Sequence, residues 1–228
     1  MDKIKKNILE IKKNISKISL DLNRAIDSVT LMAVSKKQST ENIREAYRAG
    51  QKDFGENYLQ ESISKIHELH DLEIIWHYIG SIQSNKSKLI AENYDWVHSI
   101  DKISTLKKIN KYRGSVNRKI NICIQVNIDA EDTKSGLYMN EVEDFIKGCS
   151  SMNWVNIRGL MAIPKYQSNS DLKSKAFKKI KHLFDDLIKK GYKLDTLSIG
   201  MSSDYEEAIE SGSTIVRIGT AIFGERKK

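Results

Sequence analysis

The chain has 228 residues, 39% of them hydrophobic and 30% charged, with a formal net charge of +8. This length suits one large domain or two small ones, and no segment approaches the roughly 18 uncharged apolar residues of a membrane-spanning helix. Of the 38 basic residues, 30 are Lys and only 8 are Arg, and the lysines are spread over several predicted helices. The usual DNA- and RNA-binding motifs are missing. The charge therefore predicts a solvated lysine-rich surface and no specific nucleic-acid site.

The first residues, Met-Asp-Lys-Ile-Lys-Lys-Asn, lack the apolar core and the small-residue cleavage site of a secretory signal. Cys123 and Cys149 are too few and too far apart for a disulfide framework or a metal site, so we expect two buried thiols. Both features favour a cytoplasmic protein that does not associate with a membrane.

An amphipathic helix is predicted over residues 3–24. Its apolar residues recur at alternating spacings of four and three, at Ile4, Ile8, Ile11, Ile15, Ile18 and Leu22. A partner-binding or membrane-surface helix would look similar, but a stripe of Ile and Leu without Trp or Phe favours packing on the protein's own body. We therefore expect residues 1–25 to form an N-terminal helix packed on the rest of the chain.

After this helix, short apolar and β-branched runs alternate with longer helical patterns. We expect strands over 30–35, 52–54, 74–79, 95–98, 120–127, 155–161, 195–199 and 214–218. We expect helices near 40–50, 57–69, 84–92, 101–112, 139–150, 171–190 and 203–211. Eight strands separated by helices indicate parallel pairing, and this count suits a (β/α)8 TIM-like barrel. No linker or repeat divides the sequence, so we expect one α/β domain over 1–228, with the first helix added to the outer layer.

Lys36 follows the apolar run Leu31-Met32-Ala33-Val34, at the mouth of the first predicted strand. Burial disfavours an ammonium group, so a lysine in this position can have a lowered pKa and attack carbonyl groups to form a Schiff base. Most lysines after strands are simply solvated, so the position alone makes Lys36 only a candidate nucleophile.

The loops after the last two predicted strands are rich in glycine and hydroxyl side chains. Gly200-Met201-Ser202-Ser203-Asp204 leads into a predicted helix, and Gly219-Thr220 follows the last strand. In TIM barrels these two loops commonly form a phosphate site, where backbone amides and a helix N-terminus face the anion. A phosphate site together with an amine nucleophile suggests pyridoxal 5′-phosphate, although a phosphosugar aldolase would use the same two parts.

Arg217 precedes that last glycine by two residues. An arginine there could point at the pyridine nitrogen of the cofactor, and because it keeps its proton it would leave that nitrogen unprotonated. A structural salt bridge is an equally good interpretation of Arg217.

His77 and His98 also end predicted strands, and hydrogen-bonding histidines are the favoured interpretation over acid–base groups. His67 and His70 do not have a metal-binding spacing, so no metal site is predicted.

At these residues the chain resembles the pyridoxal phosphate homeostasis protein family, also called the YggS/PROSC family, a relative of the alanine racemase N-terminal barrel. The matching segments follow one another in order, at 33–36 (AVSK), 54–61 (FGENYLQE), 76–86 (WHYIGSIQSNK), 97–101 (VHSID), 125–127 (QVN), 159–161 (GLM), 200–202 (GMS) and 216–224 (VRIGTAIFG). The resemblance implies a fold-type III pyridoxal phosphate barrel in which Lys36 forms the aldimine and Arg217 meets the pyridine nitrogen. The other cofactor contacts that it implies are Asn57, Met201, Ser202, Ser203, Gly219 and Thr220.

The resemblance also implies a function. It indicates a protein that binds pyridoxal 5′-phosphate and maintains intracellular homeostasis of this form of vitamin B6, without an established catalytic activity. Pyridoxal phosphate-dependent apo-enzymes would be the recipients, and we expect a monomer. A pyridoxal phosphate-dependent amino-acid racemase is the alternative, although the related racemases bring a catalytic tyrosine from a second domain that this sequence does not predict.

Overall fold

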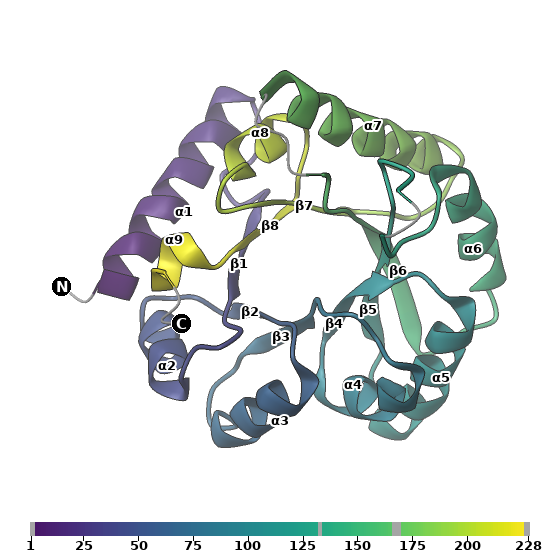
Figure 1. The fold of residues 1–228 in the computed structure, drawn as a ribbon, viewed down its shortest axis with the longest axis horizontal. Coiled ribbons are helices and arrows are strands. Elements are labelled where there is room, and N and C mark those ends of the chain that lie inside the picture. The colour runs from purple at the N-terminus through teal and green to yellow at the C-terminus, as the bar shows by residue number, and fades with distance from the viewer. Residues whose placement is uncertain (1–2, 132–133, 166–169, 226–228) are drawn as a thin grey trace.

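The computed structural model describes residues 3–131, 134–165 and 170–225. Parallel strands form a closed barrel in which each strand pairs with the next in the chain and the last pairs with the first (Figure 1). The strands are β1 (Thr30–Val34), β2 (Asp53–Glu56), β3 (Ile75–Tyr78), β4 (Trp96–Ile100), β5 (Ile120–Gln125), β6 (Val155–Met161), β7 (Thr196–Met201) and β8 (Ile215–Ile218). The predicted α/β barrel is therefore confirmed.

Helices surround the strands as an outer layer (Figure 1). They are α1 (Lys3–Asp21), α2 (Thr40–Arg48), α3 (Leu59–Glu68), α4 (Ser87–Asn93), α5 (Ile103–Arg113), α6 (Val142–Gly148), α7 (Ser170–Lys189), α8 (Tyr205–Glu210) and α9 (Thr220–Phe223). Short 3-10 turns add η1 (Ser84–Lys86), η2 (Gly114–Val116) and η3 (Met139–Glu141). The part of the chain that the structure describes holds no helix with the length and apolar character needed to cross a bilayer.

Helix α1 packs on the outside of the barrel beside α8 and α9, as predicted (Figure 1). It ends at Asp21, three residues before the predicted limit, because Asn23 takes a left-handed conformation with φ of 55°. Two hydrogen bonds close this end, from the Asn23 N–H to the Leu20 carbonyl at 2.9 Å and from the Arg24 N–H to the Ser19 carbonyl at 2.8 Å. This pattern is a Schellman motif, which stops a helix at a left-handed residue.

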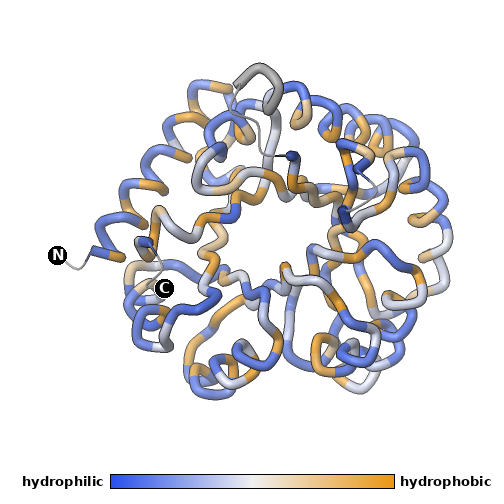
Figure 2. The backbone as a smooth tube through the Cα atoms, in the orientation of Figure 1, coloured by the Kyte–Doolittle hydropathy of each residue, from blue (hydrophilic) through white to orange (hydrophobic). Residues whose placement is uncertain are grey.

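The early end of α1 shortens its predicted apolar stripe. Ile4, Ile8, Ile11 and Ile15 are buried against the barrel, whereas Leu22 lies beyond the helix and is exposed. Along the tube of Figure 2 apolar residues alternate with polar ones on the outer helices, as expected for elements with one face on a core.

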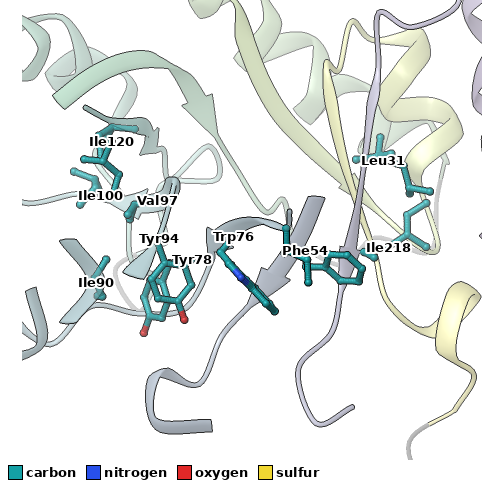
Figure 3. Close-up of a cluster of buried hydrophobic side chains, with 14 of the residues drawn as sticks. Leu31, Phe54, Trp76, Tyr78, Ile90, Tyr94, Val97, Ile100, Ile120 and Ile218 are labelled. Atoms are coloured by element: carbon teal, nitrogen blue, oxygen red, sulfur yellow. The ribbon is translucent and has the colours of Figure 1, made fainter. Parts of the chain in front are cut away.

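The largest group of buried side chains lies between the strands and the helices. Phe54 and Trp76 belong to it, with ring centroids 6.0 Å apart, together with Tyr94 (Figure 3).

Cys123 and Cys149 are buried and unpaired, as predicted, and burial raises the pKa of both thiols. Both are therefore poor nucleophiles.

Most predicted boundaries are one to three residues from the observed ones, and two differences bear on the site. β2 continues through Gly55 and Glu56, two residues beyond the predicted strand end at residue 54. Glycine and charged residues are uncommon in a central strand. The short helix α9 was not predicted at all. The end of β2 and helix α9 both lie at the carboxyl end of the barrel, next to Lys36 and Gly219.

Candidate functional site

A cavity of about 290 Å³ opens at the carboxyl ends of the strands. All eight predicted cofactor residues line it, namely Lys36, Asn57, Met201, Ser202, Ser203, Arg217, Gly219 and Thr220. They come from the ends of β1, β2, β7 and β8, and the pairing of β1 with β8 brings the first and last of these strands together. Residues separated by more than 180 positions in the chain therefore share one site.

Four apolar residues complete the lining, at Val34, Ile79, Met161 and Ile163. Sequence reasoning did not assign them to the site, although three of them end or follow a predicted strand. Their position relative to the strand ends was the available signal. They give the cavity the apolar walls and few polar groups that are typical of small-molecule sites.

Lys36 lies in the turn between β1 and α2, and its side chain is half-buried. Thr40 begins α2 after this turn, as the polar run in the sequence predicts. The next residue in the turn, Lys37, has a φ of 61°, which is uncommon for a residue with a side chain. A backbone held in such a conformation needs support from its surroundings.

That support comes from three charged side chains, which we call the Glu56–Lys65–Glu61 cluster. The Lys65 ammonium donates to the Ser35 carbonyl at 2.8 Å and to Glu56 Oε1 at 3.0 Å. The Ser35 hydroxyl donates to the same Glu56 oxygen at 2.7 Å, and the Lys37 N–H donates to Glu61 Oε1 at 2.6 Å. Hydrogen bonds therefore hold the residues on both sides of Lys36.

The cluster lies inside the protein, where charges are expensive. The Glu56 side chain is fully buried and that of Lys65 is 7% exposed. Glu56 Oε2 is buried without a hydrogen-bond partner among the described residues. Burial raises the pKa of Glu56 above its ordinary value of 4.5, although Lys65 beside it acts in the opposite direction.

This raised pKa predicts how stability depends on pH. The folded state holds the Glu56 proton more tightly than the unfolded state, so the stabilisation is complete below pH 4.5 and is lost as pH rises through the folded-state pKa. In Glu56→Gln this contribution is absent. Urea unfolding of both proteins at several pH values should show the stability advantage of the wild type over Glu56→Gln shrinking as pH rises. A difference that does not change with pH would contradict the assignment.

Asn57 follows β2 and is one of the residues that line the cavity. Its Oδ1 atom is buried and has no hydrogen-bond partner among the described residues. Its backbone packs closely on Gly80, where a Cβ would lie 2.1 Å from the Asn57 carbonyl oxygen. An unpaired buried amide at a cavity wall suits a ligand with its own polar groups.

The loops after β7 and β8 are connected to each other. The Gly219 N–H donates to Ser202 Oγ at 3.3 Å, and the Met201 N–H donates to Asp204 Oδ1 at 2.6 Å. Helices α8 and α9 have only 6 and 4 residues, so their dipoles are weak compared with those of longer helices. A bound anion would therefore depend on hydroxyl groups and local backbone, and less on a helix N-terminus than the sequence predicted.

Gly200 allows the turn from β7 into this loop. Its φ is 94°, and a Cβ would lie 2.6 Å from the Ala208 Cβ on α8. Gly191 has the same φ, but nothing lies within 4 Å of a Cβ built there. Gly200→Ala is expected to lower the free energy of unfolding by roughly 2–4 kcal/mol, from backbone strain and overpacking together.

Gly191→Ala is the matched control, because it imposes the backbone strain alone and should cost only ~1 kcal/mol. Urea unfolding of the two variants measures the difference. Equal losses would show that the contact between Gly200 and α8 does not matter.

Arg217 is buried in β8 and has no carboxylate partner among the described residues. Its guanidinium donates to the Ser198 carbonyl at 2.5 Å, to the Ser198 hydroxyl at 2.8 Å and to the Ala162 carbonyl at 3.0 Å. Burial lowers the pKa of Arg217 to about 10, while Asp204 acts in the opposite direction, so the group stays charged at neutral pH. Arg217 therefore forms no salt bridge with the described residues, and it lines the cavity.

His77 lies within β3 and His98 in the middle of β4, not at the strand ends where they were predicted, and neither lines the cavity. His77 and His98 are buried inside the barrel and hydrogen-bond to each other at 3.0 Å. Burial, followed by the proximity of His77 and Arg217, lowers the pKa of His98 well below its ordinary value, so this ring is neutral. His67 and His70 lie exposed on or next to α3.

The family model described as "Alanine racemase, N-terminal domain" matches residues 6–227. Among curated proteins, the pyridoxal phosphate homeostasis protein of Pasteurella multocida is 41% identical over 227 residues, covering 98% of this chain and 97% of that protein. The protein of the same name from Vibrio alginolyticus is 44% identical and covers 99% of both chains.

Solved structures agree with these matches. PipY of Synechococcus elongatus PCC7942, solved with pyridoxal phosphate bound, is 34% identical with a TM-score of 0.81, and the match covers 92% of this chain and 100% of that one. An alanine racemase of Clostridium difficile 630 has a TM-score of 0.77 at 14% identity, which shows a shared fold alone; the match covers all of this chain and 58% of the racemase. The chain belongs to the pyridoxal phosphate homeostasis protein family, within the larger group that shares the alanine racemase N-terminal domain.

Proposed function

We propose that this protein binds pyridoxal 5′-phosphate in the cavity at the carboxyl ends of the strands and maintains the intracellular balance of this cofactor, without catalysis of its own. One observation carries the proposal: a half-buried lysine, a buried arginine and a row of hydroxyl groups line the same cavity of about 290 Å³. This size lies near the lower limit for small-molecule sites, which suits a compact ligand.

Each group has a role in the proposal. The bound cofactor supplies an aldehyde that condenses with an amine, and Lys36 is the lysine in reach of the cavity. Ser202, Ser203 and Thr220 offer hydroxyl donors to the phosphate, and Gly219 lets the backbone come close to it. Arg217 would donate to the pyridine nitrogen, and Asn57 and Met201 would line the cofactor.

Two features favour binding over turnover. Arginine does not give up its proton, so a pyridine nitrogen facing Arg217 stays unprotonated and the ring is a weak electron sink. The cavity lining in the described part of the chain also contains no Asp, Glu, His, Cys or Tyr. A racemase needs a second acid–base group beside its lysine, so this lining does not favour the racemase alternative.

The proposal also includes the compartment, the oligomeric state and the recipients of the cofactor. A protein that keeps the cofactor available would act in the cytoplasm, as a monomer, and pass it to pyridoxal phosphate-dependent apo-enzymes. Because Lys36 is only half-buried, a Schiff base formed there would be accessible to the amine of a recipient.

The function is tested by titrating the purified protein with pyridoxal 5′-phosphate while its absorbance is recorded. We expect the band of a lysine Schiff base to grow and saturate at one cofactor per chain. The loaded protein should then exchange the α-proton of amino acids no faster than free cofactor does. Absence of the band would contradict cofactor binding, and rapid exchange that depends on Lys36 would favour the racemase.

A further inference from the structure

A row of hydrogen-bonded polar side chains crosses the interior of the barrel and ends at Arg217. Asp53 Oδ1 lies 3.0 Å from His77 Nε2, and His77 Nδ1 lies 3.0 Å from His98 Nε2. His98 Nδ1 lies 3.0 Å from Ser198 Oγ, which accepts from Arg217 at 2.8 Å. We call Asp53, His77, His98 and Ser198 the interior relay.

Through Arg217, the relay connects the amino end of the barrel with the cavity at the other end. Asp53 is the first residue of β2 and its side chain is 22% exposed, whereas His77 on β3 is 1% exposed. His98 on β4 and Ser198 on β7 are fully buried. The row therefore starts near solvent at the amino ends of the strands and reaches the cavity at their carboxyl ends.

With both histidine rings neutral, hydrogen-bond chemistry fixes the direction of every bond in this row. The Asp53 carboxylate can only accept, so His77 carries its proton on Nε2 and, when neutral, accepts at Nδ1. His98 must then donate from Nε2 and accept at Nδ1. That ring nitrogen receives the hydroxyl proton of Ser198, which leaves the Ser198 oxygen lone pairs turned toward Arg217.

The reverse arrangement leaves a buried group unpaired. If His98 carried its proton on Nδ1, both His98 and Arg217 would donate to the Ser198 oxygen. The hydroxyl proton of Ser198 would then have no acceptor among the contacts of that side chain. An unsatisfied buried hydroxyl is unfavourable, so between the two neutral arrangements the one with both histidines protonated on Nε2 is favoured.

Arg217 depends on this arrangement because no carboxylate among the described residues binds it. Two backbone carbonyls and the Ser198 hydroxyl hold its guanidinium, and the hydroxyl is the one partner that could rotate away. The histidines stop that rotation by accepting the hydroxyl proton, and Asp53 in turn fixes their tautomers. Asp53, near the amino end of the barrel, therefore restricts the orientation of the Arg217 guanidinium through this row of hydrogen bonds.

We propose that Asp53, His77, His98 and Ser198 are positioning residues that hold the Arg217 guanidinium in place to donate to the pyridine nitrogen of bound cofactor. This inference rests on the proposed function, because it assigns Arg217 its role there. The four residues do not touch the cofactor, and their effect passes through Arg217.

The first test uses the protein without cofactor. Nitrogen-15 NMR of the histidine side chains reports which ring nitrogen carries the proton. The two buried rings should carry their proton on Nε2 and not on Nδ1, and the exposed histidines His67, His70 and His182 provide reference signals. A proton on Nδ1 of His98 would overturn the relay.

The same spectra test the coupling along the row. Asp53→Ala removes the acceptor that fixes the tautomers, so a population of His98 protonated on Nδ1 should appear. Asp53→Asn keeps an acceptor oxygen and should restore the wild-type tautomer. Asp95→Ala is the matched control, because Asp95 precedes β4 with a side chain 20% exposed and binds the Trp76 N–H instead. Spectra of Asp53→Ala identical to those of the wild type would overturn the inference.

The second test measures the consequence for the cofactor. Ser198→Ala should weaken binding of pyridoxal 5′-phosphate about fivefold, which corresponds to one lost hydrogen bond of ~1 kcal/mol, and should shift the Schiff-base absorbance band. Ser213→Ala is the control, since its hydroxyl is equally buried but donates to backbone carbonyls away from the cavity. Equal affinity and an unshifted band in Ser198→Ala would overturn the positioning role.

The two proposals fail in different ways. If the wild type binds no pyridoxal 5′-phosphate, the proposed function fails, while the tautomers of the cofactor-free protein still decide whether the relay exists. If the wild type binds the cofactor but Ser198→Ala and Ser213→Ala behave alike, only the positioning role is lost.

Discussion

Replacing Lys65 with alanine is expected to lower the free energy of unfolding by about 3–5 kcal/mol at neutral pH. The Lys65 ammonium is almost completely buried and is the cation that faces both Glu56 and Glu61 in the cluster. Its removal leaves the Glu56 carboxylate buried without a counter-charge, and one oxygen of this carboxylate, Oε2, already lacks a hydrogen-bond partner among the described residues. Urea unfolding of wild type and variant measures the loss.

Lys181→Ala provides the control, because Lys181 pairs with Asp185 four residues along the partly exposed face of α7. Exposed pairs of this kind contribute only about 0.3–0.5 kcal/mol. The loss in Lys65→Ala should also be smaller in mild acid, where Glu56 takes up a proton in place of the missing cation. Similar losses in the two variants, or a loss in Lys65→Ala independent of pH, would contradict a buried charge pair.

Lys36→Ala is expected to abolish the Schiff-base absorbance completely, because no covalent bond to the cofactor can form without this amine. The fold should be unaffected, since the side chain is half-buried and lies at the cavity rim. The variant and the wild type are compared by absorbance titration with pyridoxal 5′-phosphate and by urea unfolding.

Lys37→Ala is the control for this variant, because it removes the same kind of side chain one residue further along. Lys37 is exposed and its ammonium lies 6.0 Å from the centre of the Tyr58 ring, outside the cavity lining. It should retain the Schiff-base band. Loss of the band in both variants would indicate that the turn, and not the Lys36 amine, was affected.

The barrel could be predicted because its signals are local. β-branched runs such as that at 120–127 and the apolar stripe of α1 identify each element from neighbouring residues alone. The end of β2 was missed because Gly55 and Glu56 look like loop residues. Glu56 is tolerated there because Lys65, from another element, accompanies it into the core.

The candidate site was predicted from polar residues at strand ends, and its apolar walls and supporting side chains were not. Val34 and Ile79 are ordinary apolar residues, and only their position near the ends of predicted strands could have indicated a cavity wall. The interior relay depends on four strands that meet only when the barrel closes, so Ser198 resembles an ordinary strand residue in the sequence. Pairings of this kind are set by tertiary structure and leave no periodic pattern.

The central claim is that Lys36, among thirty lysines, holds the cofactor. The most direct measurement is borohydride reduction of the wild-type protein loaded with pyridoxal 5′-phosphate, followed by digestion and mass spectrometry of the peptides. We predict one modified site, at Lys36, and no stoichiometric modification in Lys36→Ala. Modification of another lysine, or of many surface lysines to similar extents without preference for Lys36, would contradict the account.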